Sequence, residues 1–415
     1  MAGGSVGNAS PRPPAARSEG VGTPGASGRT GLDNPQSTGL TGTGQRSAGH
    51  KGMDASNPAA MPSRHTAPAK GAQPILIVPY IWIGDFVRCH TAVQLINTRF
   101  PDRAVDMLTT PRTLPLVDYM PGVRKGILSD LPRSRLALAR QWKLARRLKA
   151  EAYGSVLVMP RTWKSALAPF LARIPERTGF IGEGRFGLLN DARWGERRLA
   201  RMIDRKVALV LPNGAPLPQT YPLPRLVVPA AEASAWRARR SLADGRPVVA
   251  LCPATVGPGR RWPLGRFGEL AHRLAAAGMA VWVLGSPDDS GLAREIAKIG
   301  GSAVSDLTGP DLRDAILALK AADAAVANDS GLLHVAAAVG TPTVGIFGPS
   351  RPFLTGPLNP IAAAIEPTVA ECSTCGRPGC NRLDHRRTED IPLEPVHRAV
   401  LGALHGVSDR RAGDT

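Results

Sequence analysis

The chain has 415 residues, enough for two domains with sizeable hydrophobic cores. It carries 52 Lys and Arg against 33 Asp and Glu, a formal net charge of +19, which favours anionic partners such as nucleic acid, phosphorylated lipid or a membrane surface. No apolar stretch approaches the roughly 20 residues that span a bilayer, and no N-terminal stretch has a signal-peptide pattern. We therefore expect a cytoplasmic protein.

Residues 1–72 differ in composition from the rest of the chain. They contain no Phe, Trp, Tyr or Ile and are rich in Gly, Ser, Pro, Thr and Ala. Such a segment cannot bury enough apolar surface to offset its conformational entropy. We expect residues 1–72 to form a disordered tail, with a binding tail as the alternative.

Strand and helix patterns alternate after this tail. Apolar strand patterns lie at 75–78, 104–110 and 154–160, and a helix pattern lies at 86–99. Strands that alternate with helices indicate βαβ units and a parallel sheet. The stretch 207–230 mixes Pro and Gly with apolar residues, which suits a linker or a domain edge.

The alternation then restarts. The strand and helix patterns of this second part lie at 247–255, 264–278, 280–289, 312–323, 324–327, 332–339 and 343–347. We therefore expect an α/β protein of two Rossmann-like domains, at 73–230 and 231–405, with a short tail at 406–415. In doubly wound sheets, ligands bind beyond the carboxyl ends of the strands, so the loops there are the candidate sites.

One such loop reads Asn328-Asp329-Ser330-Gly331 and leads into a helix pattern. Unpaired N–H groups at a helix start make an anion site, and Gly331 lets backbone approach closely. His334 lies one turn into the helix and could face the same anion. The alternative is that Asp329 or Ser330 is an ordinary N-cap and His334 a packed residue.

The loop "PATVGPGRRWP" at 253–263 gives a second anion-binding signal in the same half. Arg260 and Arg261 could clamp a diphosphate, because guanidinium matches phosphate geometry bidentately. The alternative is a solvated basic loop. The chain has no G-x-x-x-x-G-K-[ST] motif, which excludes a P-loop NTPase.

In the first half, "WIGDFVRCHTA" at 82–92 places Asp85 at a strand-to-helix turn. From spacing alone, an N-cap role is favoured over a carboxylate that faces a ligand. Cys89 and His90 are interpreted as ordinary helix residues.

Three cysteines and a histidine follow one another at short spacing, as Cys372-x2-Cys375-x4-Cys380-x4-His385. Such residues could hold a tetrahedral structural zinc. The alternative is free thiols in a loop. With the net charge, a zinc-dependent nucleic-acid binder is a further possibility, although the spacing fits no standard knuckle.

The segment 133–150 is basic and carries Leu136, Trp142, Leu144 and Leu148. Helices of this kind can lie on anionic membrane surfaces. The alternative is a solvated outer helix that packs normally on the domain.

Taken together, these motifs resemble the bacterial heptosyltransferases, glycosyltransferase family nine, which build the inner core of lipopolysaccharide. The resemblance covers roughly residues 74–405. It rests on "ILIVPYIWIGDFVRCHTAVQLINTRFPDRAVDML", on "ALCPATVGPGRRWP" and on "ANDSGLLHVAAAVGTPTVGIFGPS". The stretch 157–191 is similar in detail to the heptosyltransferase II branch.

The resemblance implies two facing Rossmann-like domains (GT-B), with the acceptor on the N-terminal one and the nucleotide-sugar donor on the C-terminal one. It implies an inverting transfer without a bound metal, in which Asp85 is the general base. The implied donor-binding residues are Thr255, Arg260, Arg261, Asp329, Ser330, Gly331 and His334. Arg260 stands where the family usually has a lysine, and Val256 follows Thr255, so these two contacts depart from the pattern. The acceptor-binding candidates are Lys164, Ser165, Arg177 and Arg185.

The function that follows from the resemblance is transfer of L-glycero-D-manno-heptose from ADP-heptose to a heptose of the lipopolysaccharide inner core. The acceptor would be phosphorylated lipid A–core, and positive charge at 133–149 and 193–206 would attract it at the cytoplasmic face of the inner membrane. No nucleic acid takes part in this function. The alternatives are a transferase with another nucleotide-sugar donor, a nucleotide-sugar epimerase, and the nucleic-acid binder.

Overall fold

The computed structural model describes residues 73–413, except 133–135, 243, 258, 369–371, 373, 376, 378–379, 381 and 383–384; the side chains of 407–413 are also not described. The tail expected at 1–72 lies outside the described residues. Among the described helices, none combines the length and the apolar character needed to cross a bilayer.

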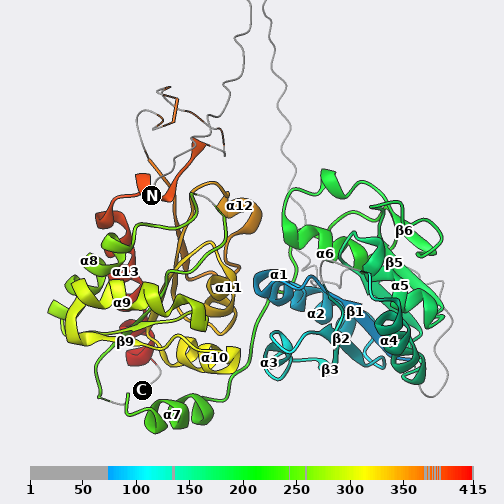
Figure 1. Cartoon of the computed structure of the whole chain (residues 1–415), viewed down its shortest axis with the longest axis horizontal. Coiled ribbons are helices and arrows are strands. Elements are labelled where there is room, and N and C mark those ends of the chain that lie inside the picture. Colours follow the sequence, from blue (N-terminus) through cyan, green and yellow to red (C-terminus); the bar gives the residue numbers. More distant parts are fainter. Residues whose placement is uncertain are drawn as a thin grey trace, which may run out of the picture. The chain divides into compact units, whose positions relative to one another are not determined.

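The first half of the described chain forms a six-stranded parallel sheet with the order β3-β2-β1-β4-β5-β6 (Figure 1). This is the Rossmann strand order. Its elements are β1 (Ile75–Val78), α1 (Ile83–Arg88), α2 (His90–Arg99), β2 (Val105–Thr109), α3 (Leu114–Val117), β3 (Val123–Leu128), α4 (Leu138–Ala150), β4 (Ser155–Val158), α5 (Trp163–Leu171), β5 (Glu176–Phe180), β6 (Asp191–Arg193), η1 (Glu196–Arg198) and α6 (Met202–Val210).

The second half repeats the same architecture with the order β12-β11-β10-β7-β8-β9, also parallel throughout. Its elements are α7 (Ala230–Arg239), β7 (Val248–Cys252), α8 (Leu264–Ala276), β8 (Ala280–Val283), η2 (Pro287–Asp289), α9 (Ser290–Gly300), η3 (Gly301–Ala303), β9 (Val304–Asp306), α10 (Leu312–Ala321), β10 (Ala324–Asn328), α11 (Gly331–Ala338), β11 (Thr343–Ile346), α12 (Pro352–Thr355), β12 (Ala362–Ile365), η5 (Thr388–Asp390) and α13 (Leu393–Gly413).

The two parallel sheets confirm the predicted fold class. Every residue of β1, β7 and β10 is buried, as expected for central strands that helices cover on both faces. In both sheets the strand order reverses at one point, between β1 and β4 in the first and between β7 and β10 in the second. Ligands of doubly wound sheets bind at this point, so we expect the ligand-binding residues in the loops after β1, β7 and β10.

Some element boundaries differ from the sequence expectation. The helix expected at 86–99 begins at Ile83 and is divided into α1 and α2 at Cys89. The helix α13 continues to Gly413, so most of the expected tail at 406–415 is helical.

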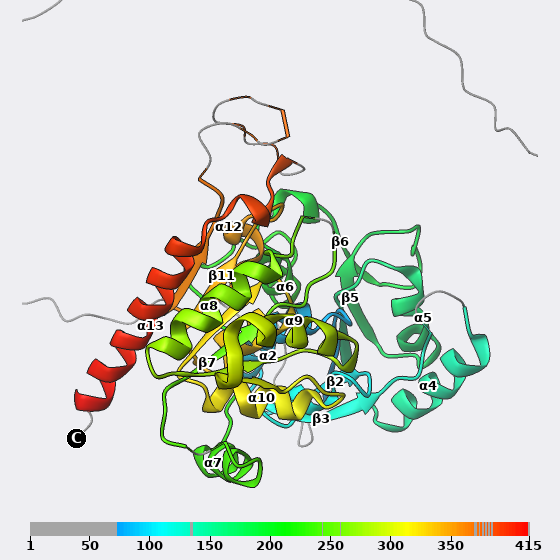
Figure 2. The same cartoon turned by 60° about the vertical axis from the view of Figure 1, so that its left-hand side comes forward.

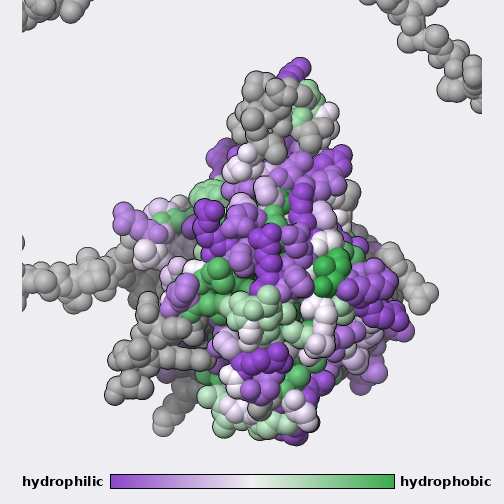
Figure 3. Space-filling model, turned by 90° about the vertical axis from the view of Figure 1, so that its left-hand side faces the viewer, coloured by the Kyte–Doolittle hydropathy of each residue, from purple (hydrophilic) through white to green (hydrophobic). Residues whose placement is uncertain are grey.

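The stretch 211–229 contains no helix or strand and links the two halves. Leu226 N donates to Ala338 O in the second half, and Val227 N donates to Tyr119 O in the first. The helix α7 that follows lies beside α10, where Trp236 Nε1 donates to Asp314 Oδ1 at 2.8 Å (Figure 2). On the face that carries α8, α9 and α13, the surface is mostly hydrophilic and apolar residues form small separate patches (Figure 3).

Candidate active site

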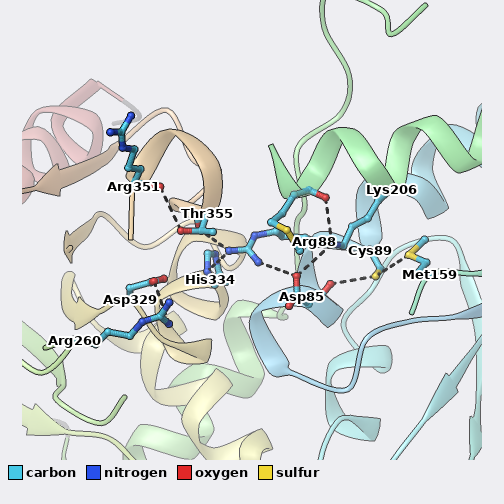
Figure 4. Close-up of polar contacts among 11 residues, drawn as sticks. Asp85, Arg88, Cys89, Met159, Lys206, Arg260, Asp329, His334, Arg351 and Thr355 are labelled. Carbon is cyan, nitrogen blue, oxygen red and sulfur yellow. Dashed lines mark hydrogen bonds and ion pairs between the residues drawn. The ribbon is translucent and has the colours of Figure 1, made fainter. Parts of the chain in front are cut away.

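The carboxylate of Asp85 lies beside two cationic side chains. Its Oδ1 accepts hydrogen bonds from Arg88 Nη1 at 3.0 Å and from Lys206 Nζ at 3.3 Å (Figure 4). Spacing alone favoured an N-cap role for Asp85, and that interpretation is wrong: Trp82 holds the N-cap position of α1, and the carboxylate bonds to the two cations. Because both contacts are made by Oδ1 and the side chain keeps 18% exposure, Asp85 can still meet a ligand.

Lys206 is a site residue that the sequence analysis missed. It comes from α6, its side chain is 1% exposed, and its Nζ lies 5.0 Å from the ring centroid of Tyr80. Burying an ammonium group is costly unless it is paired, and its partner here is Asp85, 121 residues away in sequence. No local pattern could have revealed a contact over that separation.

Arg88 connects Asp85 to the second half of the chain and was also missed. Besides its bond to Asp85, its Nη2 donates to His334 Nε2 at 2.7 Å and to the backbone oxygen of Thr355 at 2.5 Å. Its side chain is only 7% exposed. The spacing of Arg88 three residues after Asp85 on one helix was a signal that could have identified it.

Two glycines explain how closely α1 and α11 approach. A Cβ at Gly84 would lie 2.4 Å from His334 Cδ2, and a Cβ at Gly331 would lie 2.8 Å from the Cβ of Ile83. Each glycine therefore removes a clash with the other helix. The W-x-G-D and D-S-G motifs meet at this crossing.

His334 is buried, and its pKa lies well below the ordinary histidine value. Burial is the main cause, and the charges of Arg88 and Lys206 act in the same direction. Because arginine only donates hydrogen bonds, Nε2 of His334 accepts from Arg88, so the neutral ring carries its proton on Nδ1. His334 is thus a neutral positioning group at the start of α11.

The first turn of α11 has no side-chain cap. Ser330 holds the N-cap position without a capping hydrogen bond, while Asp329 Oδ2 accepts from Ser350 Oγ at 2.6 Å. Ser330 is therefore the N-cap by position but without a capping side-chain bond, and the N-cap interpretation is wrong for Asp329. A helix start with no side-chain cap is suited to receive an anion.

The loop 253–262, called the donor loop below, is fixed to the end of β10 by Asn328. The buried amide of Asn328 accepts from Trp262 N at 3.1 Å and donates to Pro253 O at 2.7 Å, so it holds both ends of the loop. Thr255 Oγ1 donates to Asp329 O at 2.9 Å. The donor loop and the start of α11 therefore form one unit.

The two candidate arginines of the donor loop are accessible. Arg260 is 39% exposed, and its Nη1 lies 3.6 Å from Asp329 Oδ2. Arg261 is exposed. At 3.6 Å the ion pair is loose. Asp329 therefore orients Arg260 without a bidentate contact, and guanidinium N–H groups of Arg260 stay available to bind an anion.

Of the four acceptor-binding candidates, Ser165 and Arg185 lie together, with Arg185 Nη1 3.4 Å from Ser165 Oγ, whereas Arg177 lies at the other end of β5. Ser165 Oγ donates to Thr162 O at 2.6 Å, and half-buried Lys164 is its neighbour at the start of α5. Arg177 donates to Ile174 O and Leu188 O.

Arg185 is 1% exposed and donates to the backbone oxygens of Pro160 and Phe180. Burial lowers the pKa of Arg185 to about 10. The guanidinium groups of Arg177 and Arg185 thus bind backbone oxygens of their own domain, and their acceptor role stays a prediction.

The four predicted metal ligands come together in the structure. The ligand atoms of Cys372, Cys375, Cys380 and His385 all lie within 4.8 Å of one another, so this group could hold a metal ion. We call the segment 372–385 the Cys/His loop.

Three comparisons with known proteins agree with one another. Residues 141–383 match the family described as glycosyltransferase family 9 (heptosyltransferase). Lipopolysaccharide heptosyltransferase 2 of Salmonella typhimurium is 36% identical over 303 residues, which cover 70% of this chain and 87% of that protein. The Escherichia coli protein of the same name is 35% identical over 303 residues, with the same coverage. The solved structure of E. coli ADP-heptose lps heptosyltransferase II has a TM-score of 0.72 and 31% identity, and covers 80% of this chain and 99% of that one.

Proposed function

This chain belongs to glycosyltransferase family 9, the heptosyltransferases, and we propose that it transfers L-glycero-D-manno-heptose from ADP-heptose to a heptose of the lipopolysaccharide inner core. The observation that carries the proposal is the crossing of α1 and α11. It brings a partly exposed carboxylate next to a helix start that has no side-chain cap. The names of the similar proteins support the donor and the class of acceptor.

Asp85 is the general base in this proposal. The acceptor hydroxyl gives its proton to the carboxylate while its oxygen attacks the anomeric carbon of the heptose. The bond from that carbon to the β-phosphate oxygen breaks, and ADP leaves from the opposite face, so the configuration inverts. Arg88 and Lys206 fix Oδ1 of Asp85, which leaves Oδ2 for the acceptor hydroxyl.

The donor diphosphate binds between the donor loop and the start of α11. Negative charge grows on the departing ADP, and donors already in place stabilise it without having to reorganise. The backbone N–H groups after Ser330, the hydroxyl of Thr255 and the guanidinium groups of Arg260 and Arg261 supply these donors. Asp329 and Gly331 belong to the same site: Asp329 orients Arg260, and Gly331 allows the close approach of α1.

The acceptor binds on the first half of the chain. Lys164 and Ser165, at the start of α5, are the residues we assign to its contact. Arg177 and Arg185 shape the backbone on both sides of that helix through their bonds to carbonyl oxygens.

We also propose that the protein works in the cytoplasm and touches the inner-membrane surface through α4. This helix carries Leu138 at 63% exposure and Trp142 at 57% exposure. It also carries several basic side chains, among them Arg146 and Lys149. Apolar and basic side chains on one helix suit the surface of an anionic bilayer, where the lipid acceptor lies. Neither the epimerase nor the nucleic-acid alternative gains support from any comparison.

For the Cys/His loop, we propose a structural zinc that takes no part in the transfer. Three thiols and an imidazole form a closed tetrahedral set, which leaves no open position for a substrate. The reacting groups assigned above all belong to other segments.

The test of the function is ADP release by purified full-length protein. With ADP-heptose and a core acceptor that ends in heptose, we expect acceptor-dependent release. Release from another nucleotide sugar, with none from ADP-heptose, would overturn the donor assignment. Equal release without any acceptor would point to hydrolysis instead of transfer.

A further inference from the structure

The Cys/His loop has the spacing of a tetrahedral metal site. The distance from Cys375 Sγ to Cys380 Sγ is 3.8 Å, and both Cys372 Sγ and Cys380 Sγ lie 3.7 Å from His385 Nδ1. With zinc–sulfur bonds of about 2.3 Å and zinc–nitrogen bonds of about 2.0–2.1 Å, tetrahedral ligand atoms lie about 3.6–3.8 Å apart. Three of the six separations between ligand atoms therefore match those that zinc requires, and all six are within 4.8 Å. Cys375 and Cys380 are free thiols in the structure.

Packing contributes little to the order of this loop. Among the described residues between 366 and 387, Cys372 is the only buried one. Among the described residues of the loop, Cys372 N donates to Arg377 O, His385 N donates to Arg382 O, and Thr374 Oγ1 donates to His385 O. A short segment whose described residues are mostly exposed or half-buried gains stability from a bound metal.

The residues directly after His385 hold the donor loop. Thr388 is buried, and both its backbone N and its Oγ1 donate to Gly259 O at 3.1 Å. A Cβ at Gly348 would lie 2.7 Å from Gly259 O and 2.7 Å from Thr388 N. Three backbone segments thus meet at Gly259, next to Arg260.

Two more contacts tie the same segment to the end of the donor loop. Trp262 Nε1 donates to Ile391 O at 2.8 Å. Arg266, at the start of α8, donates to Glu389 O at 2.7 Å. The segment 386–391 is therefore hydrogen-bonded to the donor loop at Gly259 and at Trp262. Its N-terminal end directly follows His385, the fourth metal ligand.

We propose that zinc in the Cys/His loop is the anchor of a clamp that holds the donor loop in its binding conformation. The metal fixes its four ligands, and residues 386–391, which follow His385 directly, contact Gly259 and Trp262. Arg260 is thereby held in place for the donor diphosphate. The clamp itself rests on the geometry of the loop, whereas its effect on the donor rests on the function proposed above. Zinc acts here at a distance and touches neither substrate.

The experiment combines three measurements on the reduced full-length chain. Metal content is measured by mass spectrometry, exchange of backbone amides at 253–262 by hydrogen–deuterium exchange, and ADP affinity by calorimetry. For the wild type we expect about one zinc per chain. For the double variant Cys375→Ser, Cys380→Ser we expect no zinc, faster exchange at 253–262 and ADP affinity lowered about tenfold or more.

Two single variants separate the clamp from general loss of structure. Thr388→Val keeps all four ligands but loses the Oγ1 bond to Gly259, so we expect full zinc content and ADP affinity lowered about threefold to tenfold. Arg377→Ala lies in the same loop, keeps its carbonyl and removes no ligand, so zinc and ADP affinity should stay within about twofold of the wild type.

The possible outcomes are distinct. A reduced wild type without metal, or a disulfide between Cys375 and Cys380, would overturn the metal site. A zinc-free variant with unchanged exchange at 253–262 would overturn the clamp, because the metal would then order only its own loop. If the proposed function is wrong, the results differ from both of these. Wild type would still contain zinc, and loss of zinc would still speed amide exchange at 253–262, but ADP would not bind to the wild type.

Discussion

Replacing Arg88 by methionine tests whether the base and the donor helix are coupled. The change removes a guanidinium group that bonds to Asp85 Oδ1, His334 Nε2 and Thr355 O. The buried Nε2 of His334 loses its donor, and an unsatisfied buried acceptor costs about 1–3 kcal/mol of folding free energy. A catalytic group displaced by about 1 Å loses about 100-fold in rate, which corresponds to about 2.7 kcal/mol of activation free energy.

Steady-state ADP release and calorimetry with ADP separate the two effects. For Arg88→Met we expect kcat lowered about 100-fold and an ADP dissociation constant raised by no more than about threefold, because Arg88 reaches the donor site only through its bond to His334 and the His334 ring itself remains. Arg88→Lys keeps the positive charge but not the planar set of N–H donors of a guanidinium group, so we expect kcat to fall about tenfold. Arg294→Met, on the exposed face of α9, is the control and should change neither value. A kcat within about twofold of the wild type for Arg88→Met would refute the coupling.

Three further variants test other parts of the site. Gly84→Ala places a Cβ 2.4 Å from the ring of His334, so we expect about 1–3 kcal/mol lower unfolding free energy in a denaturant titration, with activity lost in parallel; an unchanged midpoint would mean that the helices separate freely. Lys206→Met removes a buried charge, so we expect thermal stability to be kept or raised while kcat falls about tenfold; unchanged kcat would remove Lys206 from the site. His334→Gln should weaken ADP binding measured by calorimetry, because the ring that positions the start of α11 is lost; unchanged affinity would leave His334 a packing residue.

The central strands could be predicted from the sequence, and the edge strands could not. β1, β7 and β10 are continuous apolar runs because helices cover both of their faces. In β3, by contrast, Ile127 is the only buried residue. An exposed edge strand has no continuous apolar run, so a pattern of apolar residues does not reveal it.

The site was predictable where its residues stand at strand ends. Asp85 and the segment 328–334 follow β1 and β10, where parallel sheets bind ligands, and their motifs are local. Lys206 reaches Asp85 across 121 residues and is visible only in the folded chain. The N-cap expected for Asp85 was wrong because sequence spacing cannot tell whether a carboxylate turns back to its own helix or outward to a buried cation.

The most direct measurement compares wild type and Asp85→Asn for acceptor-dependent ADP release, with ADP affinity measured on the same samples. Asparagine keeps the size of the side chain and cannot take the acceptor proton, so the account predicts at least about a 100-fold loss of turnover. ADP affinity should stay within about threefold, because the donor contacts lie on the other half of the chain. Turnover retained in Asp85→Asn would contradict the account, since another group would then have to accept the proton.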